Sequence, residues 1–126
     1  MNIQELIPKN KFDGSGIEEL KSLSFEQIKP IIPDLLEWLQ DMNWPVASSI
    51  ASILKPFINR ITAELVMILK SDDVMWKYGV LISLIRNTRD LIILKELERI
   101  VKYPTKDEIE NEVDLEAIAI LNGGYK

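Results

Sequence analysis

The amino-acid sequence predicts an all-α protein made of stacked antiparallel helix pairs, with about six to seven helices in total. Three observations predict this class. Apolar residues recur every three or four positions from residue 17 onward, which is the spacing of a helix with one buried face. No stretch alternates apolar and polar residues over the length of a strand. Clusters of Pro, Gly, Asn and Asp interrupt the helical spacing, as expected for turns between short helices.

The first third of the chain predicts an arm followed by helices. Residues 1–16 are expected to form an N-terminal arm packed on the body, because Pro8 and the run at 13–16 disfavour regular structure. Residues 17–122 are expected to form a single helical domain, and 123–126 a C-terminal tail. Ser15 is a candidate helix start. Ser24 and Gln27 have the spacing of a capping box, and Pro33 suits the first turn of a helix.

The rest of the chain continues the same pattern. Pro45 is expected in the first turn of the helix after the turn at 41–45, and Pro56 ends or bends that helix. Asp72 is the expected N-cap of the next helix. After a break at 87–90 and another helix, residues 105–108 form a second capping box. The helix that starts there is expected to run unbroken to the two glycines at 123 and 124.

Composition excludes the commonest catalytic machinery. The chain has neither cysteine nor histidine, so a Ser-His-Asp triad, a Cys-His pair and a His-ligated zinc site are impossible within it. Neither a phosphate-binding glycine motif nor a calcium-binding loop is present. We therefore expect no cofactor, no metal and no enzymatic activity.

Net charge and hydropathy argue against two classes of binding partner, nucleic acids and membranes. A formal charge of −5 disfavours non-specific binding to nucleic acid or to an anionic membrane, since both need a basic surface. No apolar run approaches the ~18 residues that a membrane-spanning helix needs. The N-terminus has no basic segment followed by an apolar core, so we expect a cytoplasmic location. We therefore expect the binding partner to be a protein.

Two blocks of the sequence resemble each other. Residues 33–54 and 63–85 share a pattern of apolar positions at an offset of about 30 residues, near the lower end of helical-repeat periods. The pattern places Trp44 and Trp76 on equivalent turns. A helix pair of this size cannot bury its apolar face alone and must stack on a neighbour. A globular helical bundle stays open as the alternative.

One stretch is similar to a known signature. Residues 30–47 read PIIPDLLEWLQDMNWPVA, which resembles the signature of a bacterial family of small helical domains of unknown function. Residues 6–9, 76–78 and 103–105 match the same family. The resemblance implies a HEAT-like fold, a right-handed α–α superhelix, and it implies no activity.

The aromatic turns are the first candidate for a partner-binding surface. Tryptophan and tyrosine beside polar groups offer a large, rigid contact area. The alternative is that the tryptophans wedge helices together while the polar groups cap helix ends. The candidate partner-binding residues are Trp38, Asp41, Asn43, Trp44, Trp76, Lys77 and Tyr78.

An acidic segment near the C-terminus is the second candidate. Residues 107–116 contain no Lys or Arg, so they could present an acidic face to a basic protein, although such runs often only face water. The acids are Asp107, Glu108, Glu110, Glu112, Asp114 and Glu116. The leading hypothesis is a non-catalytic protein–protein interaction module of unknown partner. The alternatives are an immunity protein that neutralises a bacterial toxin and a metal-dependent enzyme that uses only carboxylates.

Overall fold

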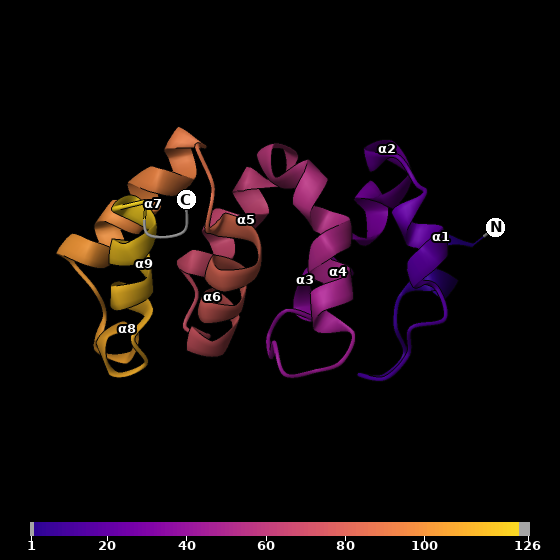
Figure 1. The fold of residues 1–126 in the computed structure, drawn as a ribbon, viewed down its shortest axis with the longest axis horizontal. Helices are drawn as coiled ribbons and strands as arrows, with labels where there is room; N and C mark the ends of the chain where they lie inside the picture. The colour runs from indigo at the N-terminus through magenta and orange to yellow at the C-terminus, as the bar shows by residue number, and fades with distance from the viewer. Residues whose placement is uncertain (1, 124–126) are drawn as a thin grey trace. The chain divides into compact units, whose positions relative to one another are not determined.

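The computed structural model describes residues 2–123, and every regular element that these residues form is helical (Figure 1). The prediction of an all-α fold is therefore confirmed. The chain divides into two compact units, Met1–Phe57 and Ile58–Lys126. The proposed tail at 123–126 lies, apart from its first residue, outside the described part of the chain. None of the described helices is long and apolar enough to cross a bilayer.

The unit Met1–Phe57 is built from short helices around an aliphatic core. Its helices are η1 (Ile3–Leu6), α1 (Ile17–Lys21), α2 (Phe25–Ile28), η2 (Lys29–Ile31), α3 (Ile32–Glu37) and α4 (Ala47–Leu54), where η1 and η2 are 3₁₀ helices. The buried core side chains include Leu20, Ile28, Ile31, Leu35, Leu36, Leu39, Ile50 and Leu54. These residues occupy the apolar stripes that the sequence spacing predicts.

Capping and proline explain where these helices begin and end. Ser24 and Gln27 form the predicted capping box, with each backbone N–H donating to the other side chain, at 2.8 and 3.3 Å. Pro33 lies in the first turn of α3 as predicted. The prediction that Pro45 lies in the first turn of the next helix is wrong, because α4 begins only after Val46. Pro30 and Pro33 lie in the first turns of η2 and α3, so the helical stretch from Phe25 to Glu37 is divided into three short segments.

The N-terminal arm lies against the first helices of its unit. Leu6 and Pro8 are buried, and the Lys11 carbonyl accepts a hydrogen bond of 3.2 Å from the Val46 N–H. Gly16 caps α1 where Ser15 was the expected start, and its backbone touches the arm. A Cβ atom on Gly16 would lie 2.6 Å from the Leu6 carbonyl oxygen. The close approach of the Leu6 backbone therefore requires a glycine at position 16.

The Gly16→Ala substitution is expected to lower the free energy of unfolding by about 1–3 kcal/mol, because the new methyl group must push the arm backbone away. Chemical denaturation would measure the change. Gly14→Ala is the matched control, since its Cβ would meet only the Ile17 side chain at 4.0 Å. Equal stabilities of the two variants would contradict the close packing of the arm.

The unit Ile58–Lys126 contains two helix pairs in two layers. Its elements are α5 (Thr62–Leu69), α6 (Val74–Val80), the π-helix η4 (Leu81–Ile85), α7 (Leu91–Lys102), α8 (Lys106–Glu110) and α9 (Val113–Leu121), while the 3₁₀ helix η3 (Lys55–Arg60) contains the unit boundary. Helix α5 contacts α6 and α7. Helix α9 contacts α7 on one side and α6 with η4 on the other. Helix α5 thus pairs with α6 and α7 with α9, and the second pair stacks on the first.

Two boundaries in this unit differ from the sequence prediction. Asp73, not Asp72, caps α6, because its extended backbone directs the carboxylate to the Trp76 N–H at 3.0 Å. The last predicted helix is divided into α8 and α9 at Asn111 and Glu112. Glu112 has a left-handed backbone with φ of 61°, which no sequence pattern indicates for a glutamate. The break turns the chain so that Val113 is buried.

Replacing Glu112 with Gly is expected to raise the free energy of unfolding by about 0.5–1 kcal/mol, because glycine adopts the left-handed region without a steric penalty. Glu110→Gly is the matched control of opposite sign. Glu110 lies in right-handed helix α8, where glycine costs about 1 kcal/mol. A loss of stability in both variants would show that the left-handed turn is not strained.

Candidate functional site

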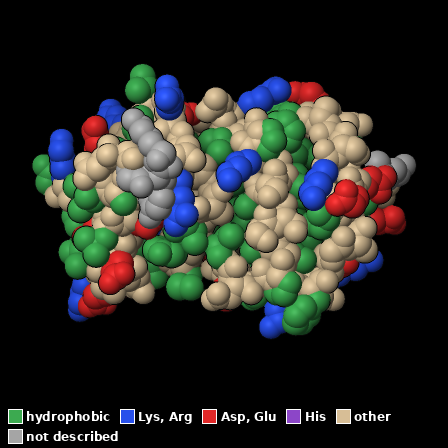
Figure 2. All heavy atoms as spheres, viewed as in Figure 1, with side chains coloured by type: hydrophobic (Ala, Val, Ile, Leu, Met, Phe, Trp, Pro, Cys, Tyr) green, Lys and Arg blue, Asp and Glu red, His purple; other side chains and the backbone are tan. Residues whose placement is uncertain are grey.

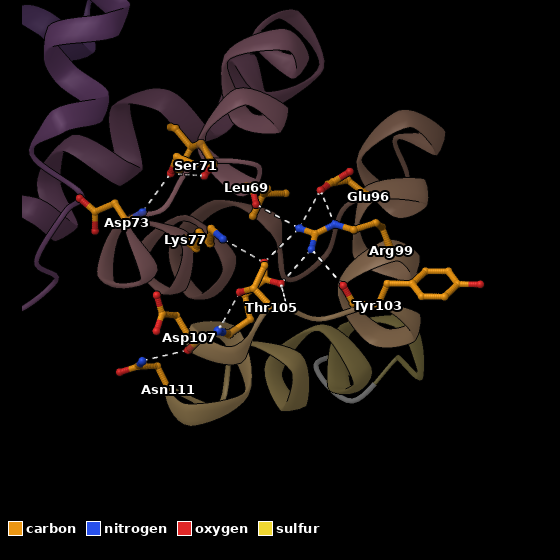
Figure 3. A network of polar contacts seen from close by, with 12 residues as sticks. Leu69, Ser71, Asp73, Lys77, Glu96, Arg99, Tyr103, Thr105, Asp107 and Asn111 are labelled. Carbon is orange, nitrogen blue, oxygen red and sulfur yellow. Dashed lines mark hydrogen bonds and ion pairs between the residues drawn. The ribbon is translucent and has the colours of Figure 1, made fainter.

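A cluster of four charged side chains lies inside the unit Ile58–Lys126 (Figure 3). Glu108 of α8 is 0 % exposed, Lys77 of α6 is 2 % exposed, and Glu96 of α7 is 7 % exposed. Arg99 of α7 joins them: its Nη1 and Nη2 donate to the two Glu108 oxygens at 2.8 and 3.0 Å. Its Nε donates to Glu96 Oε1 at 2.9 Å, and Lys77 Nζ donates to Glu108 Oε2 at 3.0 Å.

Local sequence positions each member of the cluster. The predicted capping box at Thr105 and Glu108 is confirmed: the Thr105 N–H donates to Glu108 Oε1 at 2.8 Å. This bond turns the Glu108 side chain back toward α7. The i,i+3 spacing of Glu96 and Arg99 places both on one face of α7. The N-cap of α8 therefore also fixes the central carboxylate of the cluster.

The charges in the cluster compensate one another. Burial raises the pKa of Glu108, but hydrogen bonds from Arg99, the Thr105 N–H and Lys77 lower that pKa further, to about 2. The hydrogen bonds with Glu108 also raise the pKa of Arg99, against the effect of its burial. Glu108 and Arg99 therefore both stay ionised at neutral pH. Two cations face two carboxylates, so the cluster is neutral overall.

An open cavity of about 370 Å³ adjoins this cluster. It lies between the turn from α5 to α6 and the facing side of α7. In Figure 3, the side chain of Lys77 extends from the left and that of Arg99 from the right, and the two point toward each other. The residues that line the cavity are Lys70, Ser71, Asp72, Lys77, Glu96, Arg99 and Thr105. Among residues 2–123, no three acidic side chains converge as a metal site would require.

The predicted aromatic turn of the first unit packs against itself. The rings of Trp38 and Trp44 are 5.5 Å apart and meet edge to face, and both are half-buried. Asp41 stabilises the turn, because its carboxylate accepts a hydrogen bond of 2.8 Å from the Asn43 N–H. Asn43 is exposed. These contacts are those of the alternative interpretation, in which tryptophan packing and local capping hold the turn.

The predicted candidates of the second unit differ in exposure. Trp76 is half-buried and Tyr78 is 36 % exposed. Lys77 lies between them in sequence but points inward to Glu108. It therefore does not present the exposed charge that the partner-binding hypothesis assigned to it. Lys77 is also one of the residues that line the cavity.

The acidic segment near the C-terminus does not present all of its carboxylates to solvent. Glu108 and Glu116 are buried, and Glu116 Oε1 lies 3.6 Å from Arg86 Nε. Glu108 pairs with Lys77 and Arg99, and Glu116 pairs with Arg86, so these two carboxylates are not part of an exposed acidic face. Asp107, Glu110 and Glu112 are exposed, and Asp114 is half-buried.

Helix α9 is apolar on two faces, which the sequence analysis missed. Its inner face buries Val113, Ala117 and Ile120, as expected for a core helix. Its outer face leaves Leu115 55 % and Ile118 37 % exposed, and Ile109 of the adjoining helix α8 is also exposed. Figure 2 shows apolar and acidic side chains next to each other over the region where Figure 1 places α8 and α9. The signal in the sequence is that residues 117–121 are all apolar.

These features define an all-α protein of paired helices with an internally neutralised ion cluster and one apolar helix face that its own unit leaves uncovered. The chain belongs to the family described as "Domain of unknown function (DUF5071)", whose model matches residues 6–121. The expected resemblance to a family of unknown function is thereby confirmed. No match was found among curated proteins.

Proposed function

We propose that the protein is a non-catalytic protein-interaction module that binds its partner through the outer surface of α8 and α9. This α8–α9 face consists of Ile109, Leu115 and Ile118 with the exposed carboxylates of Asp107, Glu110 and Glu112. The observation that carries the proposal is the apolar outer side of α9, whose inner side is already buried. A surface helix in a globular protein normally has one apolar stripe only.

The exposed side chains supply the affinity in this proposal. Covering a part-exposed Leu or Ile side chain contributes on the order of 1 kcal/mol, since full burial contributes about 1.5–3 kcal/mol. Leu115 and Ile118 are three positions apart and so lie on the same side of α9. A partner that covers both gains area that the isolated chain leaves in water.

The charges around the face define the chemistry of the partner. The exposed carboxylates of Glu110 and Glu112 lie close in sequence to the apolar side chains, and Lys106 lies 3.8 Å from Glu110. A basic protein surface complements this arrangement. A second copy of the chain does not, because a symmetric contact would bring the same carboxylates together.

Partner binding by variants of the α8–α9 face tests the proposal. Proteins that co-purify with the wild-type chain would be identified, and their affinity measured by titration. The double variant Leu115→Ser, Ile118→Ser is expected to weaken binding roughly 30- to 100-fold. Met67→Ser is the matched control, since Met67 is 72 % exposed on α5. Unchanged affinity in the double variant would remove the proposal.

The aromatic turns remain a predicted partner-binding surface, and a second double variant tests them in the same binding assay. The double variant Trp44→Ala, Trp76→Ala removes one indole from each unit. If this variant loses the partner while the Leu115 and Ile118 double variant keeps it, the contact lies at the turns. Circular dichroism would establish that each variant is folded.

The proposal also covers the type of helical fold, the source and the cellular location of the protein. The stacking of two helix pairs within Ile58–Lys126 and the repeat offset of about 30 residues support a HEAT-like right-handed superhelix. We also propose a bacterial source and a cytoplasmic location for the protein.

The second candidate function is an immunity protein. The exposed acids at 107, 110 and 112 favour it, because they suit a basic toxin. A toxin-like reading frame beside the gene would support that candidate, and a housekeeping operon would count against it.

A further inference from the structure

We propose that the cavity beside the ion cluster binds a small zwitterion of the α-amino acid type, with its carboxylate on Lys77 and its ammonium group on Glu96. This site is separate from the α8–α9 face and does not rest on the proposed function. Its residues belong to α6 and α7 and to the two turns that flank them.

Lys77 is the first reason for this proposal. An ammonium group carries three N–H donors, and Glu108 Oε2 accepts one of them at 3.0 Å. The other two have no acceptor among residues 2–123, although the side chain is only 3 % exposed. Lys77 lines the cavity, so an acceptor placed there can satisfy it.

Glu96 is the second reason. Its Oε1 atom accepts from Arg99 Nε and also lies 2.9 Å from Arg99 Nη2. Its other oxygen has no donor within the described part of the chain, and the residue is 7 % exposed. Glu96 lines the same cavity as Lys77. The cavity thus offers both a donor and an acceptor that are charged and nearly buried.

Charge balance selects a ligand that is neutral overall. Lys77 and Arg99 are balanced by Glu96 and Glu108, and Lys70 and Asp72 balance each other at the rim. An ion of either sign would therefore be desolvated without a compensating charge. A zwitterion forms one charge-assisted hydrogen bond at each end instead. A carboxamide is a weaker match, because it brings the same donor and acceptor without the charges.

Arg99 has no free donor to offer a ligand. Its guanidinium has five N–H groups, and the Leu69 and Tyr103 carbonyl oxygens accept from it in addition to Glu96 and Glu108. Arg99 therefore acts as a positioning residue that holds the Glu96 carboxylate at the cavity wall. The volume of about 370 Å³ lies within the range of small-molecule pockets, about 300–1,000 Å³.

NMR titration of the intact chain tests the inference. The probes are L-alanine and L-leucine as zwitterions, acetamide as a carboxamide, and acetate and methylammonium as single charges. We expect both amino acids to bind at least about 10-fold more tightly than acetate or methylammonium. The shifted amides should centre on Ser71, Lys77 and Thr105. Equal binding of acetate would overturn the inference, and so would the absence of any shift with the amino acids at millimolar concentration.

Three substitutions add a check that does not depend on the probe set. Glu96→Gln keeps the shape of the side chain and removes its charge, so the affinity for L-alanine is expected to fall about 10-fold. Glu98→Gln, on the exposed side of α7, is the control. Lys70→Gln changes only the exposed rim and is expected to alter affinity by less than about 3-fold. A larger effect of Lys70→Gln than of Glu96→Gln would place the ligand outside the cavity and overturn the assignment.

Discussion

Replacing Glu108 with Gln is expected to lower the free energy of unfolding by about 3–5 kcal/mol, because the substitution leaves buried Lys77 and half-buried Arg99 without their shared carboxylate. The amide of glutamine can still accept the Thr105 N–H, so the helix cap is largely kept. What is lost is the negative charge between Lys77 and Arg99. Chemical denaturation followed by circular dichroism would measure the change.

Glu110→Gln is the matched control for this prediction. Glu110 lies in the same helix, is exposed, and pairs with Lys106 only at 3.8 Å. Its loss is expected to change the free energy of unfolding by no more than about 0.5 kcal/mol. Similar effects of the two substitutions would mean that the buried cluster contributes nothing beyond an ordinary surface pair.

A second substitution separates charge imbalance from lost packing. In the double variant Glu108→Gln, Lys77→Met, one cation leaves together with the carboxylate, and Met fills a similar volume. We expect Lys77→Met to cost several kcal/mol less in the Glu108→Gln background than in the wild type. Additive effects would contradict electrostatic coupling between the two groups.

Sequence periodicity predicts the helices well because helix formation is largely local. The capping boxes at Ser24 and Thr105 depend on residues three positions apart, and both predictions are confirmed. The left-handed turn at Glu112 could not be predicted, because glutamate has no preference for that conformation. It follows from tertiary packing, which buries Glu108 before the turn and Val113 after it.

The ion cluster could not be predicted for a related reason. Lys77 and Glu108 are 31 positions apart. The sequence places Lys77 in a candidate partner-binding turn and Glu108 in a capping box, and no local pattern pairs the two. The acids at 107–116 read as one solvated face, whereas the fold turns Glu108 and Glu116 inward to neutralise cations. The outer side of α9 was missed because helical spacing at Val113, Ala117 and Ile120 accounts for the inner side alone.

Acid is expected to destabilise the protein through Glu108 within a defined pH range. The pKa of Glu108 is about 2 in the folded state, against an ordinary value of 4.5. A carboxyl group with a lowered folded-state pKa contributes its full stability above the unfolded pKa and loses it as pH falls toward the folded pKa. Glu108 therefore contributes about 3 kcal/mol at neutral pH, which is lost between about pH 5 and pH 2.

Comparison of the wild type with Glu108→Gln isolates this contribution. Other carboxyl groups act in the same direction, since the hydrogen bond from Thr62 lowers the pKa of Asp90 despite partial burial. Such groups titrate in both proteins, so they cancel in the difference. The stability gap between the two proteins should be constant from pH 7 to about pH 5 and should then close as pH falls. A gap of constant size down to about pH 2 would mean that Glu108 does not owe its stabilising effect to its charge.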